Sequence, residues 1–131
     1  IGVIFRHPFG AVLMDVTSEK SVAEARDKIL SLSPSIDVIV NNAGYSYKGE
    51  NAGYEEAKKT MEVNYFGAQR VTEALMSLLT VNGRIVNVCS FVGMLKQVSP
   101  SIQKKLADPA ATITALNDLA DEFLQAVKDD R

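Results

Sequence analysis

The sequence contains one cysteine, one histidine and no tryptophan among its 131 residues. A single cysteine, Cys89, excludes an internal disulfide and is typical of proteins from a reducing compartment. No group of His, Cys or carboxylate residues has the spacing of metal ligands, so we expect no metal site. His7 stands apart from any motif, and we expect it at the surface.

Charge of one sign and long apolar runs are also missing. Lys and Arg total 14 against 16 acidic residues, and the net charge of -2 gives no electrostatic reason to expect nucleic acid or an acidic membrane as a partner. No apolar run approaches the ~20 residues that span a bilayer, and the start lacks a signal-type apolar core. We therefore expect a cytoplasmic protein with neither nucleic-acid nor membrane partners.

Length and composition are those of one globular domain. Hydrophobic residues make up 47% of the chain and charged residues 23%. The chain begins Ile1-Gly2-Val3-Ile4 without a methionine, and it stops directly after a strongly periodic segment. We expect it to be the central part of a single domain in a longer protein.

Short apolar runs alternate with longer periodic segments. The runs at residues 11–14, 36–40 and 84–88 predict strands, of which the last two are predicted to be buried. A turn at Val81-Asn82-Gly83 is predicted before the third strand. A helix is predicted from a cap at Thr17 or Ser18 to Ser33, and a second over 54–79, interrupted at Asn64 and Gly67. A loop is predicted at 44–53. This alternation indicates an α/β fold with a parallel sheet. The predicted buried faces are Val22, Ala25, Ile29 and Leu32 in the first helix, and Ala57, Met61, Ala68, Val71, Leu75 and Leu78 in the second.

The region after residue 90 has a helical pattern. Ser99 and Pro100 predict the cap and first turn of a short helix. A longer helix follows from apolar residues at helical spacing. Its predicted apolar face consists of Leu116, Leu119, Ala120, Phe123 and Val127.

Three motifs accompany these predicted elements. Asn41-Asn42-Ala43-Gly44 ends the run at 36–40, residues 61–67 read Met-Glu-Val-Asn-Tyr-Phe-Gly, and residues 83–90 lead into Ser90. In this order and spacing they resemble the short-chain dehydrogenase/reductase family, most closely its monomeric carbonyl reductase branch, over roughly residues 11 to 131. The resemblance implies a partial doubly wound, Rossmann-like parallel sheet, with residues 1–10 unmatched and a helical insertion at 94–131.

The resemblance implies two catalytic residues. Ser90 would polarise the substrate carbonyl, because carbonyl reduction leaves negative charge on oxygen and needs a donor there. Asn64 would mark a helix irregularity that holds a water in the proton relay behind the active-site lysine. The ordinary alternatives are a serine that only terminates a strand and an asparagine on a solvated helix face.

The resemblance also implies an NADP(H) site. Asp15, Val16 and Val63 would lie at the adenine, and Asn42, Ala43 and Gly44 at the ribose and nicotinamide. On position alone Asp15 serves equally well as a helix cap. A glycine at position 44 permits close approach of the backbone.

Neighbouring residues receive more modest interpretations. Tyr47 and Lys48 would border the substrate pocket. Asn41 is expected to hold the sheet together, and Gly67 to let its helix approach a neighbour closely. Cys89 is predicted to be a buried, inert thiol facing the opposite side of the sheet from Ser90.

Two parts of the family pattern are missing. The chain has no Gly-rich strand-to-helix turn, which would hold a pyrophosphate, and no Tyr-x-x-x-Lys after Ser90, which would exchange a proton near neutrality. The segment from Tyr54 to Lys58 has that spacing. It precedes Asn64 and Ser90, which reverses the family order, so we interpret it as a coincidence.

The complete protein is expected to be a monomeric oxidoreductase that reduces small carbonyl compounds (aldehydes, ketones or quinones) with NADPH. The alternatives are a catalytically inactive truncated chain or partial nucleotide-binding module, and a scaffold protein. In the doubly wound order the first strand present would be separated from the others by two absent strands, which leaves an open sheet edge. We therefore expect the isolated chain to fold poorly and not to turn over substrate.

Overall fold

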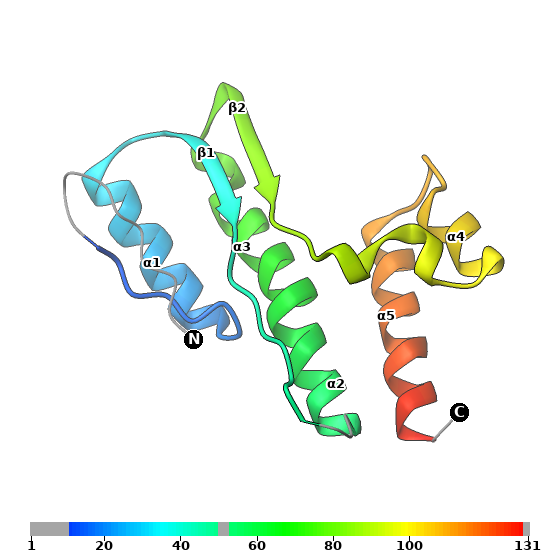
Figure 1. The fold of residues 1–131 in the computed structure, drawn as a ribbon. Helices are drawn as coiled ribbons and strands as arrows, with labels where there is room; N and C mark the ends of the chain where they lie inside the picture. The colour runs from blue at the N-terminus through cyan, green and yellow to red at the C-terminus, as the bar shows by residue number, and fades with distance from the viewer. Residues whose placement is uncertain (1–10, 50–52, 130–131) are drawn as a thin grey trace. The chain divides into compact units, whose positions relative to one another are not determined.

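The computed structural model describes residues 11–49 and 53–129. By their contacts the described residues form two compact units, the first from residues 11–49 and 59–88 and the second from 53–58 and 89–129. Figure 1 shows the elements along the chain. His7 lies outside the described residues, so its predicted exposure stays a prediction.

The first unit begins with helix α1, Glu19–Leu32. Its N-cap is Ser18, whose hydroxyl accepts a hydrogen bond from the Ser21 amide at 3.2 Å. Of the two predicted caps, Thr17 and Ser18, the structure uses Ser18. The predicted stripe is buried at Val22, Ala25 and Ile29. It was wrong at Leu32, which is 43% exposed, because the helix ends there and the side chain lies beyond the packed turns.

The sheet consists of two parallel strands, β1 (Ile36–Asn41) and β2 (Leu79–Asn87). Regular pairing runs from Val38 opposite Arg84 to Asn41 opposite Asn87. The register shifts between Ile36 and Val38. Ile36 pairs with Leu79 whereas Val38 pairs with Arg84, so β2 has extra residues over this stretch. The predicted turn at Val81–Gly83 is therefore an irregularity inside a longer strand.

The strand predicted at residues 11–14 was wrong. The structure assigns those residues no element and gives only an isolated bridge at Asp15. Strands exist through hydrogen bonds to a neighbour, and the described sheet contains β1 and β2 alone. Met14 and Val16 are nevertheless buried, at 2% exposure each, so packing holds this segment where pairing does not.

The long helix predicted over 54–79 is continuous but changes its geometry. It consists of α2 (Tyr54–Met61), a π-helical turn η1 (Glu62–Phe66), α3 (Gly67–Leu75) and a 3₁₀ turn η2 (Met76–Leu78). The π turn is closed by the Gly67 amide, which donates to the Glu62 carbonyl five residues earlier. The interruption predicted at Asn64 is therefore confirmed.

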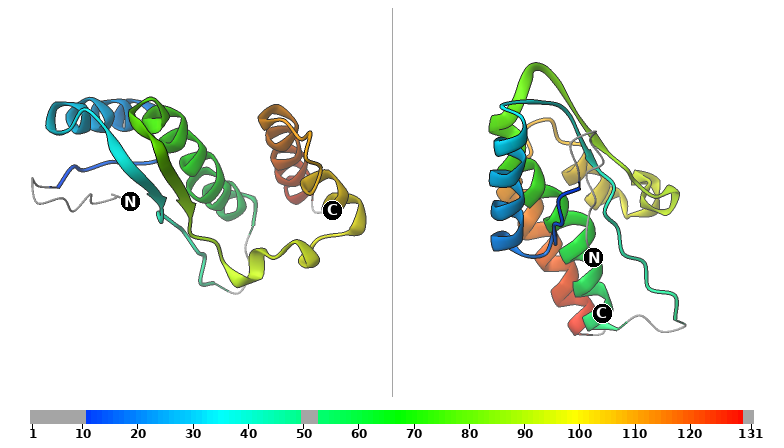
Figure 2. Two further views of the ribbon diagram at one scale, coloured as in Figure 1. Left: turned by 90° about the horizontal axis from the view of Figure 1, so that it is seen from above. Right: turned by 90° about the vertical axis from the view of Figure 1, so that its left-hand side faces the viewer.

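The two helices α1 and α3 lie side by side on one face of the sheet (Figure 2). The core fills the space between them and the strands. Its buried residues are Met14, Val16, Val22, Ala25, Ile29, Ile39, Val63, Val71, Leu75 and Leu78. The predicted face of the long helix is confirmed at Val71, Leu75 and Leu78 and is only partly buried at Ala57, Met61 and Ala68.

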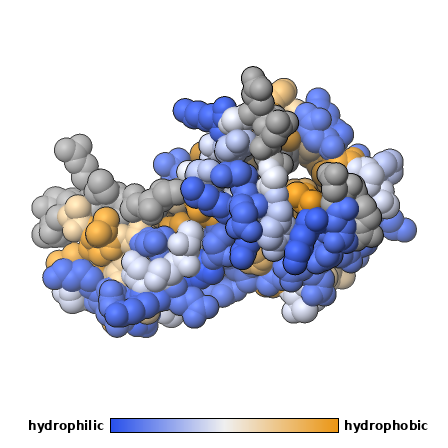
Figure 3. Space-filling model, turned by 90° about the horizontal axis from the view of Figure 1, so that it is seen from below, coloured by the Kyte–Doolittle hydropathy of each residue, from blue (hydrophilic) through white to orange (hydrophobic). Residues whose placement is uncertain are grey.

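The predicted burial of both strands was wrong in part for β1 and throughout for residues 84–88. In β1, Ile39 is 1% exposed, whereas Val38 and Val40 beside it are 43% and 47% exposed. In the second strand region, Ile85, Val86 and Val88 are 38%, 43% and 59% exposed. Successive residues of a strand point to opposite faces, and within the described residues helices cover one face. Figure 3 shows hydrophobic patches interrupting a largely hydrophilic surface.

The second unit contains the 3₁₀ turns η3 (Phe91–Gly93) and η4 (Leu95–Gln97) and the helices α4 (Pro100–Leu106) and α5 (Ile113–Lys128). The predicted cap Ser99 accepts from the Ile102 amide at 3.4 Å. Along the predicted face of α5, Ala120 is buried, but Phe123 is 49% exposed. None of the helices in the described ranges is long and apolar enough to cross a membrane.

Candidate functional site

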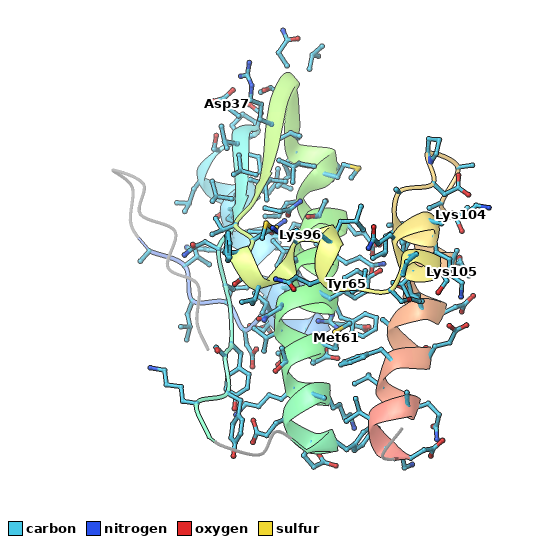
Figure 4. All side chains as sticks on the ribbon, turned by 45° about the vertical axis from the view of Figure 1, so that its right-hand side comes forward. Asp37, Met61, Tyr65, Lys96, Lys104 and Lys105 are labelled. Carbon is cyan, nitrogen blue, oxygen red and sulfur yellow. The ribbon has the colours of Figure 1, made fainter. Side chains whose placement is uncertain are left out.

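The carboxyl end of β1 is anchored by Asn41. Its side-chain amide donates to the Thr72 hydroxyl at 2.9 Å and to the Asn87 side-chain oxygen at 2.8 Å. Its carbonyl accepts from the Val88 amide at 3.0 Å. Asn41 thus joins β1 to both α3 and β2, which confirms its predicted structural role. At the opposite end of the sheet, Asp37 accepts from the Thr80 hydroxyl at 3.1 Å (Figure 4).

The residues that follow β1 border a small cavity. Three residues of the predicted cofactor set line it, namely Val16, Asn42 and Ala43. Its volume of about 20 Å³ is roughly that of one water molecule. The remaining lining residues are Met14, Ile39, Val40, Asn41, Gly67, Ala68 and Val71. The fold therefore brings the turn at residue 16 and the loop at 42–43 together.

Two glycines beside this cavity differ in their surroundings. A Cβ built on Gly67 would lie 2.8 Å from Val16 Cγ2 and 3.2 Å from the Glu62 carbonyl. The predicted close approach at Gly67 is therefore confirmed, and its neighbour is Val16. A Cβ on Gly44 would meet nothing closer than Asn64 Oδ1 at 3.8 Å, which is ordinary contact. The described chain itself thus leaves room at Gly44.

Asn64 connects the π turn to the loop after β1. Its Oδ1 accepts from the Tyr45 amide at 2.7 Å, and its Nδ2 donates to the Tyr45 carbonyl at 2.9 Å. The side chain therefore pairs with one residue of backbone as a neighbouring strand would. The Lys59 ammonium lies 4.2 Å from the centre of the Tyr45 ring, which adds a cation–π contact. The predicted relay water is untested, but the alternative of a merely tolerated asparagine does not describe these contacts.

Asp15 forms a turn of its own rather than capping α1. Its Oδ1 accepts from the Thr17 amide at 2.9 Å and from the Thr17 hydroxyl at 2.8 Å. These two bonds lower the pKa of the Asp15 carboxyl below its usual range. The carboxylate is therefore ionised at neutral pH.

Arg70 was missed by the sequence interpretation. Its Nη1 donates to the Val16 carbonyl at 2.6 Å, and its Nη2 donates to Glu62 Oε1 at 2.9 Å. The Arg70 side chain is 21% exposed. The available signal was a cation one turn after Gly67 on the largely apolar face of α3, with a carboxylate eight residues earlier.

The residues predicted to border a substrate pocket lie in the loop after Tyr45. Tyr47 is 38% exposed, and its ring occupies the space in which a side chain at Gly49 would lie. Lys48 is exposed. Their predicted role at a substrate stays a prediction.

Ser90 lies in the second unit, three residues after β2 ends, at the N-cap of η3. Its Oγ accepts from the Val92 amide at 3.3 Å. That bond uses a lone pair of the hydroxyl and not its proton. Cys89 is exposed, so the prediction of a buried thiol was wrong, because the ladder stops at Asn87 and nothing in the described part covers the residue.

Two tyrosines of the long helix have distinct surroundings. The Lys128 ammonium lies 5.7 Å from the centre of the Tyr54 ring, and the interpretation of the Tyr54–Lys58 spacing as a coincidence stays a prediction. Tyr65 follows Met61 by one turn along the helix (Figure 4), and burial raises the pKa of its phenol. Within the described residues no three His, Cys, Asp or Glu side chains are grouped to hold a metal ion.

Comparison with known proteins identifies the family. The family model described as short chain dehydrogenase matches residues 6–103, and the chain belongs to this family. It is 33% identical over 119 residues to carbonyl reductase (NADPH) 1 of Rattus norvegicus. That match covers 88% of this chain and 43% of the relative, so the chain spans less than half the length of the curated relative.

Solved structures share the fold. Menthone neomenthol reductase from Mentha piperita has a TM-score of 0.78 at 27% identity, covering 89% of this chain and 54% of that one. Salutaridine reductase from Papaver somniferum has a TM-score of 0.78 at 28% identity, covering 89% and 52%. The predicted α/β, Rossmann-like fold class is therefore confirmed.

Proposed function

We propose that the complete protein reduces small carbonyl compounds with NADPH. One observation carries the proposal: the fold gathers Val16, Asn42 and Ala43 around one cavity at the carboxyl end of β1. In an open α/β sheet, ligands bind at the carboxyl ends of the strands. The name of the rat relative, carbonyl reductase (NADPH) 1, supports the choice of cofactor and reaction.

The described residues fit a nicotinamide cofactor. Gly44 offers an approach to the backbone that a larger side chain would narrow, since a Cβ there would meet only ordinary contacts, with Asn64 Oδ1 at 3.8 Å and the Asn42 carbonyl at 4.0 Å. Asp15, Val16 and Val63 would border the adenine, and Asn42, Ala43 and Gly44 the ribose and nicotinamide. When bound, the cofactor supplies a hydride to the carbonyl carbon.

Ser90 and Asn64 would serve the carbonyl oxygen and the proton path. The Ser90 hydroxyl accepts from the Val92 amide and keeps its proton to donate to the substrate oxygen, where negative charge develops. Both polar atoms of Asn64 bond to Tyr45, and each can form one more hydrogen bond. We propose that the relay water takes one of these two remaining hydrogen bonds.

A cofactor and substrate screen tests the proposal. The complete protein is titrated with NADPH and with NADH, and its consumption of each is followed with a quinone, an aromatic aldehyde and a cyclic ketone. We expect NADPH to bind more tightly and to be consumed with at least one of these carbonyls. Absence of consumption of either cofactor with all three would refute the proposal.

A second candidate is a nucleotide-binding module without activity. Such a module would bind the cofactor through the loop at residues 42–44 and would have no proton donor for the carbonyl oxygen. Assaying the 131-residue chain beside the complete protein separates the two. Cofactor binding without turnover in both proteins would favour the module.

A further inference from the structure

The irregular helix is bonded to two segments near the cavity beside β1. Asn64 pairs with the backbone of Tyr45, two residues after the lining residue Ala43. Arg70 donates to the backbone of Val16, which itself lines the cavity. The first contact lies on the proposed nicotinamide side and the second on the proposed adenine side.

The backbone of this turn is bonded at Asp15, whose amide donates to Ser21 Oγ at 2.9 Å and whose carbonyl accepts from the Ser18 amide at 3.1 Å. Residues 11–14 belong to no strand, and the next residue of the turn, Val16, is 2% exposed. A carbonyl in such a buried residue needs a donor. The Arg70 guanidinium on α3 supplies this donor at 2.6 Å. In a sheet, the donor to such a carbonyl would be a backbone amide of the neighbouring strand.

Glu62 orients the guanidinium. Its carboxylate accepts from Arg70 Nη2 at 2.9 Å, and its side chain is 39% exposed against 21% for Arg70. The pair spans the π turn, since Glu62 begins η1 and Arg70 lies in α3. Because the guanidinium is planar and rigid, the bond from Nη2 to Glu62 fixes the orientation in which Nη1 donates to the Val16 carbonyl.

We propose that Arg70 is a positioning residue that fixes the turn at Asp15 and Val16 and so sets the affinity of the site for the adenosine half of the cofactor. The inference rests on the proposed function. The loop at Asn42–Gly44 has its own anchors at Asn41 and Asn64, so Arg70 affects cofactor binding and not hydride transfer.

Four variants of the complete protein test this assignment. Arg70→Met keeps the apolar stem and removes both donors, Arg70→Lys keeps the charge, and Glu62→Gln weakens the orientation of the guanidinium. Arg26→Met is the matched control, because Arg26 pairs with its neighbour Asp27 on the surface of α1 at 2.8 Å. The readouts are the KM for NADPH, the Ki of ADP-ribose, kcat at saturating NADPH and the melting temperature.

We expect Arg70→Met to raise the KM for NADPH and the Ki of ADP-ribose by about tenfold, the loss of one charge-assisted hydrogen bond. Glu62→Gln and Arg70→Lys should raise both by a smaller factor, kcat should stay within about twofold of wild type, and Arg26→Met should change none of these. An unchanged Ki with a lowered melting temperature, or a fall in kcat at constant KM, would overturn the inference.

Two further outcomes keep the tests separate. If Arg70→Met does not fold, Glu62→Gln decides, because an unchanged Ki in that variant overturns the inference. If wild type binds neither NADPH nor NADH, the proposed function fails and this inference fails with it. If wild type binds NADPH and Arg70→Met binds it equally well, the inference alone fails.

Discussion

The two units of the chain are each stabilised internally by a different kind of interaction. Among the described residues, every buried apolar side chain except Ala120 lies in the first unit. That unit is also tied across long sequence separations, by Asn64 to Tyr45 and by Arg70 to Val16. The second unit has local helix caps at Ser99 and Thr112, and its Lys105–Glu122 ion pair at 3.3 Å lies between exposed side chains.

This difference predicts different effects of substitutions in the two units. The first unit builds a cavity whose walls are packed, so its residues affect both stability and cofactor binding. The second unit presents Ser90 at the start of a short exposed turn, where a side chain can be changed with little effect on packing. Stability and catalysis should therefore respond to different substitutions.

The largest expected effect comes from identical truncations in the two units. Leu75→Ala removes a side chain that is 0% exposed and should lower the free energy of unfolding by about 2–5 kcal/mol. Leu106→Ala, at a position 43% exposed in the second unit, should cost under about 1 kcal/mol. Urea unfolding of the complete protein measures both, and equal losses would remove the contrast between the units.

Ser90→Ala should reverse that pattern. Loss of a donor to the developing oxyanion lowers kcat by about 10²–10³-fold, while the melting temperature should change little because Ser90 is exposed. Steady-state kinetics with NADPH and a reducible carbonyl measure the effect. Ser90→Thr, which keeps a hydroxyl, is the control. Wild-type kcat in Ser90→Ala would show that this serine only caps its turn.

The two glycines sharpen the comparison inside the first unit. Gly67→Ala places a Cβ against Val16 and should cost about 1–3 kcal/mol of stability. Gly44→Ala meets only ordinary contacts and should change stability by under about 0.5 kcal/mol, while it weakens NADPH binding. Thermal melts and cofactor titrations of both variants distinguish them. Unchanged NADPH affinity in Gly44→Ala would contradict the role of that position at the cofactor.

The smallest effect is the acid dependence of the Asp15 turn. Its pKa is lowered in the folded protein by the two bonds from Thr17, so the stabilisation it provides is present above the unfolded pKa of about 3.9 and is lost as pH falls through the folded pKa. Asp15→Asn should therefore be less stable than wild type near neutrality, with the difference shrinking at low pH. A constant difference between about pH 2 and pH 7 in urea unfolding would contradict this account.

The sequence predicted regular elements well where their signals are local. The caps at Ser18 and Ser99, the strand at 36–40 and the stripe of α3 depend on residues within a turn or two. The strand at 11–14, the burial of Val38 and Val40 and the buried state of Cys89 were wrong. Each depends on a neighbouring strand or helix, which a local pattern does not specify.

The candidate site divides in the same way. The motif Asn41–Gly44 and the interrupted helix at Asn64 were visible in the sequence because unusual residue types stand at fixed spacing. Arg70 was not, since its two partners are Val16, 54 positions away, and Glu62, eight positions away across a π turn. A sequence pattern cannot specify which backbone carbonyl a long side chain will reach.

By itself the sequence determined the order of the helices and of β1 and β2, the caps at Ser18 and Ser99 and the family to which the chain belongs, because these depend on residue type and spacing. Tertiary structure alone decided that Val16 is the neighbour on which Gly67 packs, and that Arg70 and Asn64 bond to the backbone of Val16 and Tyr45. The physical reason is that packing distances and hydrogen-bond partners are set only when segments far apart in the sequence come into contact.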